Sequence, residues 1–238
     1  MEPFVRISEI AVPFDEANVD TNQLCPTRFN KVPKGERFWS VMLHDRRFNP
    51  DESEKPEFIF NQEPYRHAGI IVAGRNFGVG SSRETAVFGL VYFGIRCVIA
   101  PSLGDIFTNN AFKNGVLPIV LPAEAVTDLM RQLQAERGAK IAVDLPTQAV
   151  IAPNGTTYTF DIHPLRKRCL SLGLDEISLT KTFGSRIESF ETNYKRECDW
   201  LDAGVCSRIA LRASRLRRGA GRVRGLVSLG QRRCGADV

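Results

Sequence analysis

The sequence predicts an α/β fold built from parallel β–α units, followed by a region with an antiparallel hairpin and helices. Between residues 69 and 137, short apolar runs alternate with longer stretches of helical character, and the linking loops are short. Strands that alternate with helices in this way are typical of parallel β–α units. After Gly138 short strand-like runs replace this pattern, which indicates a change to antiparallel pairing.

The first part of the chain predicts one strand and a long irregular segment. Residues 7–14, ISEIAVPF, have the apolar pattern of a strand, and the polar residues 18–26 predict a loop after it. Residues 30–66 are rich in Pro, Lys, Glu, Asn and aromatic residues and have no sustained period. A segment of this length usually forms a functional loop or an excursion that faces a partner.

Three parallel units follow this segment, and each combines a buried apolar strand with a helix. Gly115 is expected to end the second of these helices in a left-handed conformation. In chain order, we expect a strand at 69–73, a helix near 82–93, a strand at 95–100, a helix within 102–115, a strand at 116–122 and a helix at 123–137.

The region after Gly138 predicts a hairpin. Residues 140–145, KIAVDL, and the two halves of 149–162, AVIAPNGTTYTFDI, have the character of short strands. Asn154–Gly155 predicts a two-residue turn between those halves.

Two helices are expected after the hairpin. The first starts with Pro164 in its first turn and ends at Gly173, and the second covers 184–197. In the first helix we expect an apolar face of Leu165, Cys169 and Leu172 and a solvated face of Arg166, Lys167 and Arg168.

The charge of the chain is concentrated at its C-terminal end. The formal net charge is +5 over 238 residues. Residues 201–238 contain nine arginines and two aspartates, a net charge of +7, so residues 1–200 sum to −2. We expect one folded domain over 1–197 and a basic, disordered Arg/Gly/Ala-rich tail over 198–238. A nucleic-acid-binding arm is the alternative interpretation of this tail.

Composition argues against several classes of protein. The chain has no apolar run of the roughly 18–20 residues that a membrane span needs. Its first residues, MEPFVRISEIAVPFDE, lack the pattern of a signal peptide, so we expect a cytoplasmic protein. The six cysteines include no C-x-x-C pair and the three histidines are dispersed, so we expect no metal site in this chain alone.

A glycine-rich turn, GRNFGVGSSRETA at 74–86, follows the predicted strand 69–73. It fails the dinucleotide-binding fingerprint because Arg83 stands where the third glycine is needed, and it fails the P-loop pattern because it has no lysine. Glycines still let the backbone approach a ligand, and a helix that begins near Ser82 offers free N–H groups to an anion. Arg83 in the first turn could bind a carboxylate through two hydrogen bonds.

The alternative is a purely structural turn. Ser81-x-x-Glu84 fits a capping box, in which Ser81 caps the helix and Glu84 bonds back to it. A capping box does not explain an arginine at a helix start, where the dipole disfavours a positive charge.

Four segments in the same order resemble the small-subunit family of the 3-isopropylmalate dehydratases, which corresponds to the swivelling β/β/α domain of the aconitase superfamily. The resemblance extends over roughly residues 8–195, and the tail has no counterpart. The segments are ANVDTNQLCPTRF at 17–29, GRNFGVGSSRE at 74–84, IAPSLGDIFTNNAFKNGVLPI at 99–119 and DIHPLRKRCLSLGLDEISLT at 161–180.

The resemblance implies a hydro-lyase that interconverts 2-isopropylmalate and 3-isopropylmalate by dehydration and rehydration in leucine biosynthesis. It also implies a large partner subunit whose [4Fe–4S] cluster binds the leaving hydroxyl as a Lewis acid. By position, Ser81 would be the catalytic base, acting as an alkoxide. Ser82 and Arg83, with the backbone N–H groups of Gly80 to Ser82, would bind the substrate carboxylate; Asp20 and Thr21 would border the site.

This sequence departs from the usual family pattern at three positions. Val79, Thr85 and Asn22 stand where the family usually has cysteine, histidine and aspartate. Two alternatives therefore stay open. One is a paralogous enzyme for citraconate or 2,3-dimethylmalate, and the other is a non-catalytic module that binds carboxylates or nucleic acid.

Overall fold

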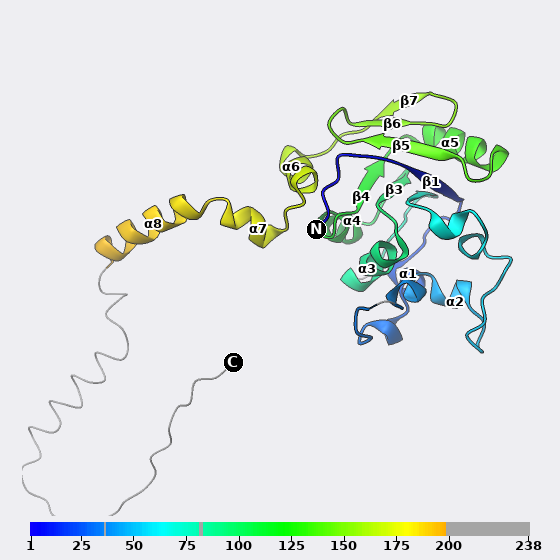
Figure 1. Ribbon diagram of the computed structural model, residues 1–238, viewed down its shortest axis with the longest axis horizontal. Coiled ribbons are helices and arrows are strands. Elements are labelled where there is room, and N and C mark those ends of the chain that lie inside the picture. The colour runs from blue at the N-terminus through cyan, green and yellow to red at the C-terminus, as the bar shows by residue number, and fades with distance from the viewer. Residues whose placement is uncertain (36, 81–82, 199–238) are drawn as a thin grey trace, which may run out of the picture. The chain divides into compact units, whose positions relative to one another are not determined.

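The computed structural model describes residues 1–35, 37–80 and 83–198 (Figure 1). Backbone contacts divide the chain into two compact units, Met1–Thr182 and Phe183–Val238. The basic tail predicted over 198–238 lies outside the described residues except for Cys198, and the domain boundary at residue 197 stays a prediction. No helix among the described residues is both long enough and apolar enough to cross a membrane.

The first unit is built on a mixed sheet, which confirms the predicted α/β class with parallel units and a hairpin. Among the described residues the strands follow the order β4-β3-β2-β1-β5-β6-β7, in which β1 to β4 are parallel and β5 to β7 are antiparallel. The strands are β1 Arg6–Phe14, β2 Ile70–Ala73, β3 Cys97–Ala100, β4 Leu117–Val120, β5 Lys140–Asp144, β6 Ala149–Ile151 and β7 Thr157–Thr159.

Strand β1 joins the two halves of the sheet. Its residues 6–10 pair antiparallel with β5, and residues 11–14 pair parallel with β2. The burial changes at the same point, because residues 11–14 are fully buried whereas residues 6–10 are half-buried or exposed. Strands covered on both faces carry continuous apolar runs, as 11–14 and β2 do.

Helices cover both faces of the parallel strands (Figure 1). Alternate residues of β2 point into two separate cores: Ile71 packs with α3 and α4, and Ile70 packs with α5. The helices of the first unit are α1 Thr21–Leu24, α2 His44–Arg47, α3 Glu84–Phe93, α4 Asp105–Lys113, α5 Ala123–Ala135, α6 Pro164–Leu172 and α7 Glu176–Lys181, and the second unit contains α8 Gly184–Glu197. The short 3₁₀ turns are η1 Thr27–Phe29, η2 Phe38–Val41, η3 Ile59–Asn61 and η4 Tyr65–His67.

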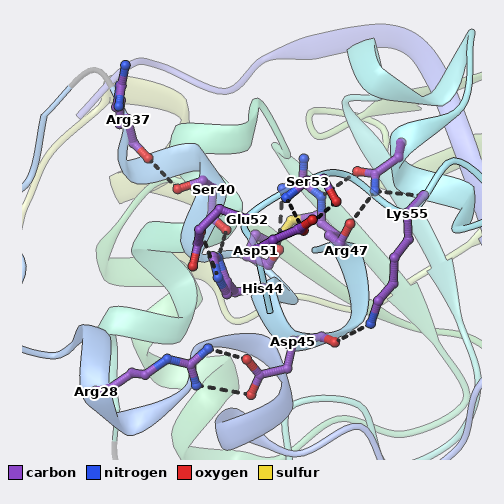
Figure 2. Close-up of polar contacts among 12 residues, drawn as sticks. Arg28, Arg37, Ser40, His44, Asp45, Arg47, Asp51, Glu52, Ser53 and Lys55 are labelled. Carbon is purple, nitrogen blue, oxygen red and sulfur yellow. Dashed lines mark hydrogen bonds and ion pairs between the residues drawn. The ribbon is translucent and has the colours of Figure 1, made fainter. Parts of the chain in front are cut away.

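The irregular segment 30–66 is part of the core rather than an external loop. Its buried side chains include Phe38, Met42, Leu43 and Phe60, all of which belong to the cluster that covers one face of β2. On the surface of this segment, charged side chains form hydrogen bonds with Asp45 (Figure 2). The Arg28 guanidinium pairs with the Asp45 carboxylate, and Lys55 Nζ donates to the Asp45 carbonyl at 2.9 Å.

Arg47 is the largest fully buried side chain and stabilises this segment from within. Its Nε donates to Asn61 Oδ1 at 3.0 Å and its Nη1 donates to the Trp39 carbonyl at 3.1 Å. Asn61 Nδ2 returns a hydrogen bond to the Arg47 carbonyl at 2.6 Å. Burial lowers the pKa of Arg47 to about 10, so the guanidinium still carries its charge at neutral pH.

The hairpin has a longer turn than the two-residue turn that was predicted. The Ala152 amide donates to the Thr156 carbonyl at 2.8 Å, so Pro153, Asn154 and Gly155 form a three-residue loop. Only Gly155 has a positive φ, at 85°, whereas a type I′ turn needs a positive φ at both central residues. A left-handed glycine after a right-handed turn is the usual form of a three-residue hairpin loop.

The predicted faces of α6 were wrong in part: Arg168 is exposed as expected, and Pro164 and Gly173 bound the helix, but the buried side differs. Leu170 is the buried residue of α6, and its carbonyl accepts from the Phe4 amide at 2.9 Å. Leu165 and Leu172 are about half exposed, because the N-terminal segment packs on the Leu170 side. On the predicted solvated face, Arg166 lies over the Phe112 ring and Lys167 donates to the Pro146 carbonyl.

We expect Asn61→Ala to destabilise the first unit by about 1–3 kcal/mol, since it removes a partner from the buried Arg47 and from two backbone carbonyls. Urea denaturation of the variant and of the original protein measures this difference. Asn30→Ala, at an exposed asparagine of the same segment, is the matched control and should change stability by less than about 0.5 kcal/mol. Equal effects of the two variants would contradict this account of Arg47.

Candidate functional site

The predicted site lies at the carboxyl ends of the parallel strands, where three loops meet. The loop after β1 pairs with the glycine-rich turn after β2 through a parallel bridge between Asp20 and Val79. The same turn pairs with the loop after β3 through a bridge between Phe77 and Leu103. In open α/β sheets, ligands bind at this edge.

Backbone hydrogen bonds fix the loop after β1 against the glycine-rich turn. The Asn18 amide donates to the Arg75 carbonyl at 2.8 Å, and the Gly78 amide donates to the Val19 carbonyl at 2.7 Å. The Thr21 amide then donates to the Val79 carbonyl at 2.9 Å. These bonds continue the pairing of β1 and β2 beyond the ends of both strands.

Close backbone packing requires a glycine in the turn, at Gly74, and one in the loop after β3, at Gly104. A Cβ at Gly74 would overlap the Glu16 carbonyl, and a Cβ at Gly104 would lie 2.5 Å from the Gly78 oxygen. Gly78 itself has a φ of +74° and packs against the Phe107 ring. Of the two glycines in the spacing that imitates a phosphate-binding fingerprint, Gly78 is therefore required by its positive φ and by its contact with Phe107.

The structure brings together four of the six predicted site residues. Asp20 caps α1, where its Oδ1 accepts from the Gln23 amide at 2.7 Å, and Thr21 is buried beside it. Gly80, with a φ of +111°, lies against Asp20 and Thr21. Arg83 reaches the same loop through its side chain. The other two, Ser81 and Ser82, lie outside the described residues.

The helix after the turn begins later than predicted, and this overturns the capping box. Helix α3 begins at Glu84, and Arg83 is its N-cap residue in an extended conformation. Glu84 is therefore the first helical residue, whereas a capping box needs it as the third. Its Oε1 accepts from Asn114 Nδ2 at 3.0 Å instead.

Arg83 binds an amide and not a carboxylate. Its Nη1 donates to Asn22 Oδ1, which also accepts from Thr27 Oγ1 at 2.8 Å. Arg83 takes part in none of the ion pairs between described residues. The sequence interpretation assigns neither Asn22 nor Thr27 a role. The signal for Asn22 is its position directly after Asp20 and Thr21.

Cys25 lies near this arginine but is not a nucleophile. Burial raises the pKa of its thiol to about 11, although the charges of Arg83 and Arg28 act in the opposite direction. A thiol with this pKa is protonated at neutral pH and does not react. Among the described residues, no group of three or more His, Cys, Asp or Glu side chains is placed to hold a metal ion.

This arrangement can bind an anion. A guanidinium without a carboxylate partner among the described residues stands at a helix N-terminus, and the exposed Gly80 lies three residues before it in the chain. Both features attract a carboxylate, and a planar guanidinium can bind it with two parallel hydrogen bonds.

Comparisons with known proteins agree on one family. The family model described as the aconitase C-terminal domain matches residues 1–124, and the LeuD_N model matches residues 127–164. The 3-isopropylmalate dehydratase small subunit of Gluconacetobacter diazotrophicus is 46% identical over 200 residues, which covers 84% of this chain and 97% of that protein. The small subunit of Roseobacter denitrificans is 46% identical over 201 residues, which covers 84% of this chain and all of that protein.

A solved structure has a similar fold. The crystal structure of 3-isopropylmalate dehydratase from Methanocaldococcus jannaschii superposes with a TM-score of 0.55 at 26% sequence identity. The match covers 78% of this chain and 99% of that one.

We expect Gly74→Ala to destabilise the protein by about 1–3 kcal/mol, because its Cβ would overlap a backbone carbonyl that cannot rotate away. Thermal or urea unfolding measures the loss. Gly35→Ala is the matched control, since no atom lies within 4 Å of a Cβ built there. An unchanged stability of Gly74→Ala would show that the loops at this edge can separate at little cost.

Proposed function

The chain belongs to the family of 3-isopropylmalate dehydratase small subunits, and from this premise we propose that it is the small subunit of a two-subunit hydro-lyase. The proposed reaction is the interconversion of 2-isopropylmalate and 3-isopropylmalate in leucine biosynthesis, in the cytoplasm. The single observation that carries the proposal is the Arg83 guanidinium, which bonds Asn22 in the loop of Asp20 and Thr21 and has no carboxylate partner among the described residues, an arrangement that suits a dicarboxylic acid substrate.

Arg83 and the groups before it bind and orient the substrate in this proposal. The Arg83 fork and the Ser82 hydroxyl bind one carboxylate, and backbone N–H groups from Gly80 onward assist. The proton to be removed is alpha to a carboxylate and is very weakly acidic. Positive charge over that carboxylate stabilises the negative charge that develops when the proton leaves.

Ser81 is the proposed base. A serine hydroxyl is ordinarily too weakly acidic for this role, so its anion needs stabilisation. Two sources are near in the chain: the positive end of the α3 dipole and the guanidinium of Arg83. As an alkoxide, Ser81 would take the alpha proton in the dehydration step and return a proton in the rehydration step.

The partner is proposed to be a large subunit that carries a [4Fe–4S] cluster. The described residues of this chain contain no metal-binding group that fits a cluster, so we assign the cluster to the partner. When bound there, it would supply Lewis-acid assistance to the departure of the hydroxyl. In this proposal, the chain itself binds the substrate carboxylate and transfers the alpha proton.

A paralogous enzyme for citraconate or 2,3-dimethylmalate is the second candidate. Two of the three positions that differ from the usual family pattern contact the site directly. Asn22 accepts from Arg83, and Val79 pairs with Asp20. Thr85 lies in the first turn of α3. Changes at such positions affect the choice of substrate more than the chemistry.

We expect the chain alone to be inactive, and the complex with its matched large subunit to prefer isopropylmalate over citraconate and 2,3-dimethylmalate. Measured kcat/KM values for the three acids test this. Apolar differences in a pocket typically discriminate by about 10–200-fold, so a preference of about tenfold for either alternative acid would reassign the substrate. Activity of the chain without any partner would contradict the two-subunit proposal.

Ser81→Ala should reduce kcat by several orders of magnitude with little change in KM, because the base acts only in the transition state. Arg83→Lys should raise KM and lower kcat, since a point charge cannot replace the planar fork. Steady-state kinetics of the reconstituted complex measure both effects. If Ser81→Ala kept normal turnover and lost only about 1 kcal/mol of stability, Ser81 would have a structural role.

A further inference from the structure

We infer that Asn22 is a positioning residue that holds the Arg83 guanidinium in place for the substrate carboxylate. This inference rests on the proposed role of Arg83 in binding a dicarboxylic acid. It concerns a residue outside the groups that the family resemblance assigns to the site.

The atoms of the contact are determined by hydrogen-bonding chemistry. Arg83 can only donate, so the atom of Asn22 that faces it must be the amide oxygen. That oxygen also accepts from Thr27 Oγ1 at 2.8 Å. Two donors on one oxygen fix the rotation of the amide, so Asn22 presents a defined acceptor to Arg83.

The backbone that carries Asn22 is equally well fixed. Asn22 is the second residue of α1, whose N-terminus is capped by Asp20 and whose Thr21 amide is bound to Val79 in the glycine-rich turn. The Leu43 amide donates to the Leu24 carbonyl at 2.9 Å, which ties the end of α1 to the buried segment. The acceptor therefore stands on a rigid support in the loop opposite Arg83.

The acceptor of Arg83 is a neutral amide, as it is for Arg166, whereas several other arginines have carboxylate acceptors. Arg28, Arg46 and Arg66 are each paired with a carboxylate. Arg83 has a neutral acceptor, and toward the described residues it donates through Nη1 alone. A guanidinium has five N–H donors in a rigid plane, so holding one of them orients the others without removing them from a ligand.

A positioning role predicts a specific kinetic pattern. If Asn22 fixes Arg83, removing its oxygen should weaken substrate binding while leaving the proton transfer by another residue largely intact. A residue that only stabilises the fold would instead change the amount of active enzyme, which lowers apparent kcat without changing KM.

The first experiment measures KM and kcat of the complex with its large subunit for Asn22→Ala, Asn22→Asp and Thr27→Val. Loss of a hydrogen bond to a charged group should raise KM of Asn22→Ala about tenfold or more, with kcat changed less than about threefold. Asn22→Asp keeps an acceptor oxygen and should restore KM to within about threefold, because exposed ion pairs are weak. Thr27→Val should raise KM less than Asn22→Ala, and Gln23→Ala, an exposed neighbour on α1, should leave it unchanged.

The second experiment has a readout other than activity. In the full chain labelled with ¹⁵N-arginine, the side-chain signals of Arg83, assigned by their loss in Arg83→Lys, should show slow rotation in the original protein and in Asn22→Asp. They should show fast rotation in Asn22→Ala.

The outcomes separate this inference from the proposed function. An unchanged KM in Asn22→Ala, or an Asn22→Asp variant as impaired as Asn22→Ala, would overturn the positioning role. If the complex turned over none of the three acids while the Arg83 signals still depended on Asn22, the proposed function would fail and the positioning contact would stand.

Discussion

Strand β1 is the element on which the fold and the site both depend, because it is divided between two modes of pairing. Residues 6–10 pair antiparallel with β5, and residues 11–14 pair parallel with β2. One continuous strand therefore locks the register of the hairpin region to that of the parallel units. Its carboxyl end leads directly into the loop that carries Asp20 and Thr21, so the same strand sets the position of this side of the site.

The site itself is held by backbone contacts rather than by side chains. The loops after β1 and β2 exchange main-chain hydrogen bonds at Asn18, Gly78 and Thr21, the loop after β3 is bonded at Phe77, and the glycines in these loops permit the close approach. Main-chain contacts of this kind are insensitive to the side chains beside them. They leave the side chain at Val79 free to vary while the frame around the ligand stays the same, whereas Asn22 acts through its own side-chain contact with Arg83.

The parallel units could be predicted from sequence because each buried strand is a continuous apolar run such as IIVA at β2. Local features that depend on tertiary contacts could not. The start of α3 shifted to Glu84, the hairpin turn included Pro153, and the buried side of α6 proved to be Leu170. For α6, packing against a distant segment decided the outcome, as the hydrogen bond from the Phe4 amide to the Leu170 carbonyl illustrates.

The site was predicted in a similarly partial way. The pairing of Asp20 and Thr21 with Gly80 came from the family resemblance, since nothing in the local sequence relates residues 60 positions apart. The contact between Arg83 and Asn22 could not be predicted, because an exposed asparagine has no sequence signature for its partner. The burial of Arg47 was not predicted either, because arginine is almost never fully buried and its sequence therefore indicates an exposed side chain.

The burial of Cys25 has a practical consequence for labelling chemistry. Burial raises the pKa of its thiol to about 11, so the thiol is protonated at pH 7. Maleimide or iodoacetamide reagents would therefore react poorly with this cysteine, although it lies near Arg83, which we propose binds the substrate. Cys169 and Cys198, which are only half-buried, offer better attachment points for probes that leave the ligand-binding edge untouched.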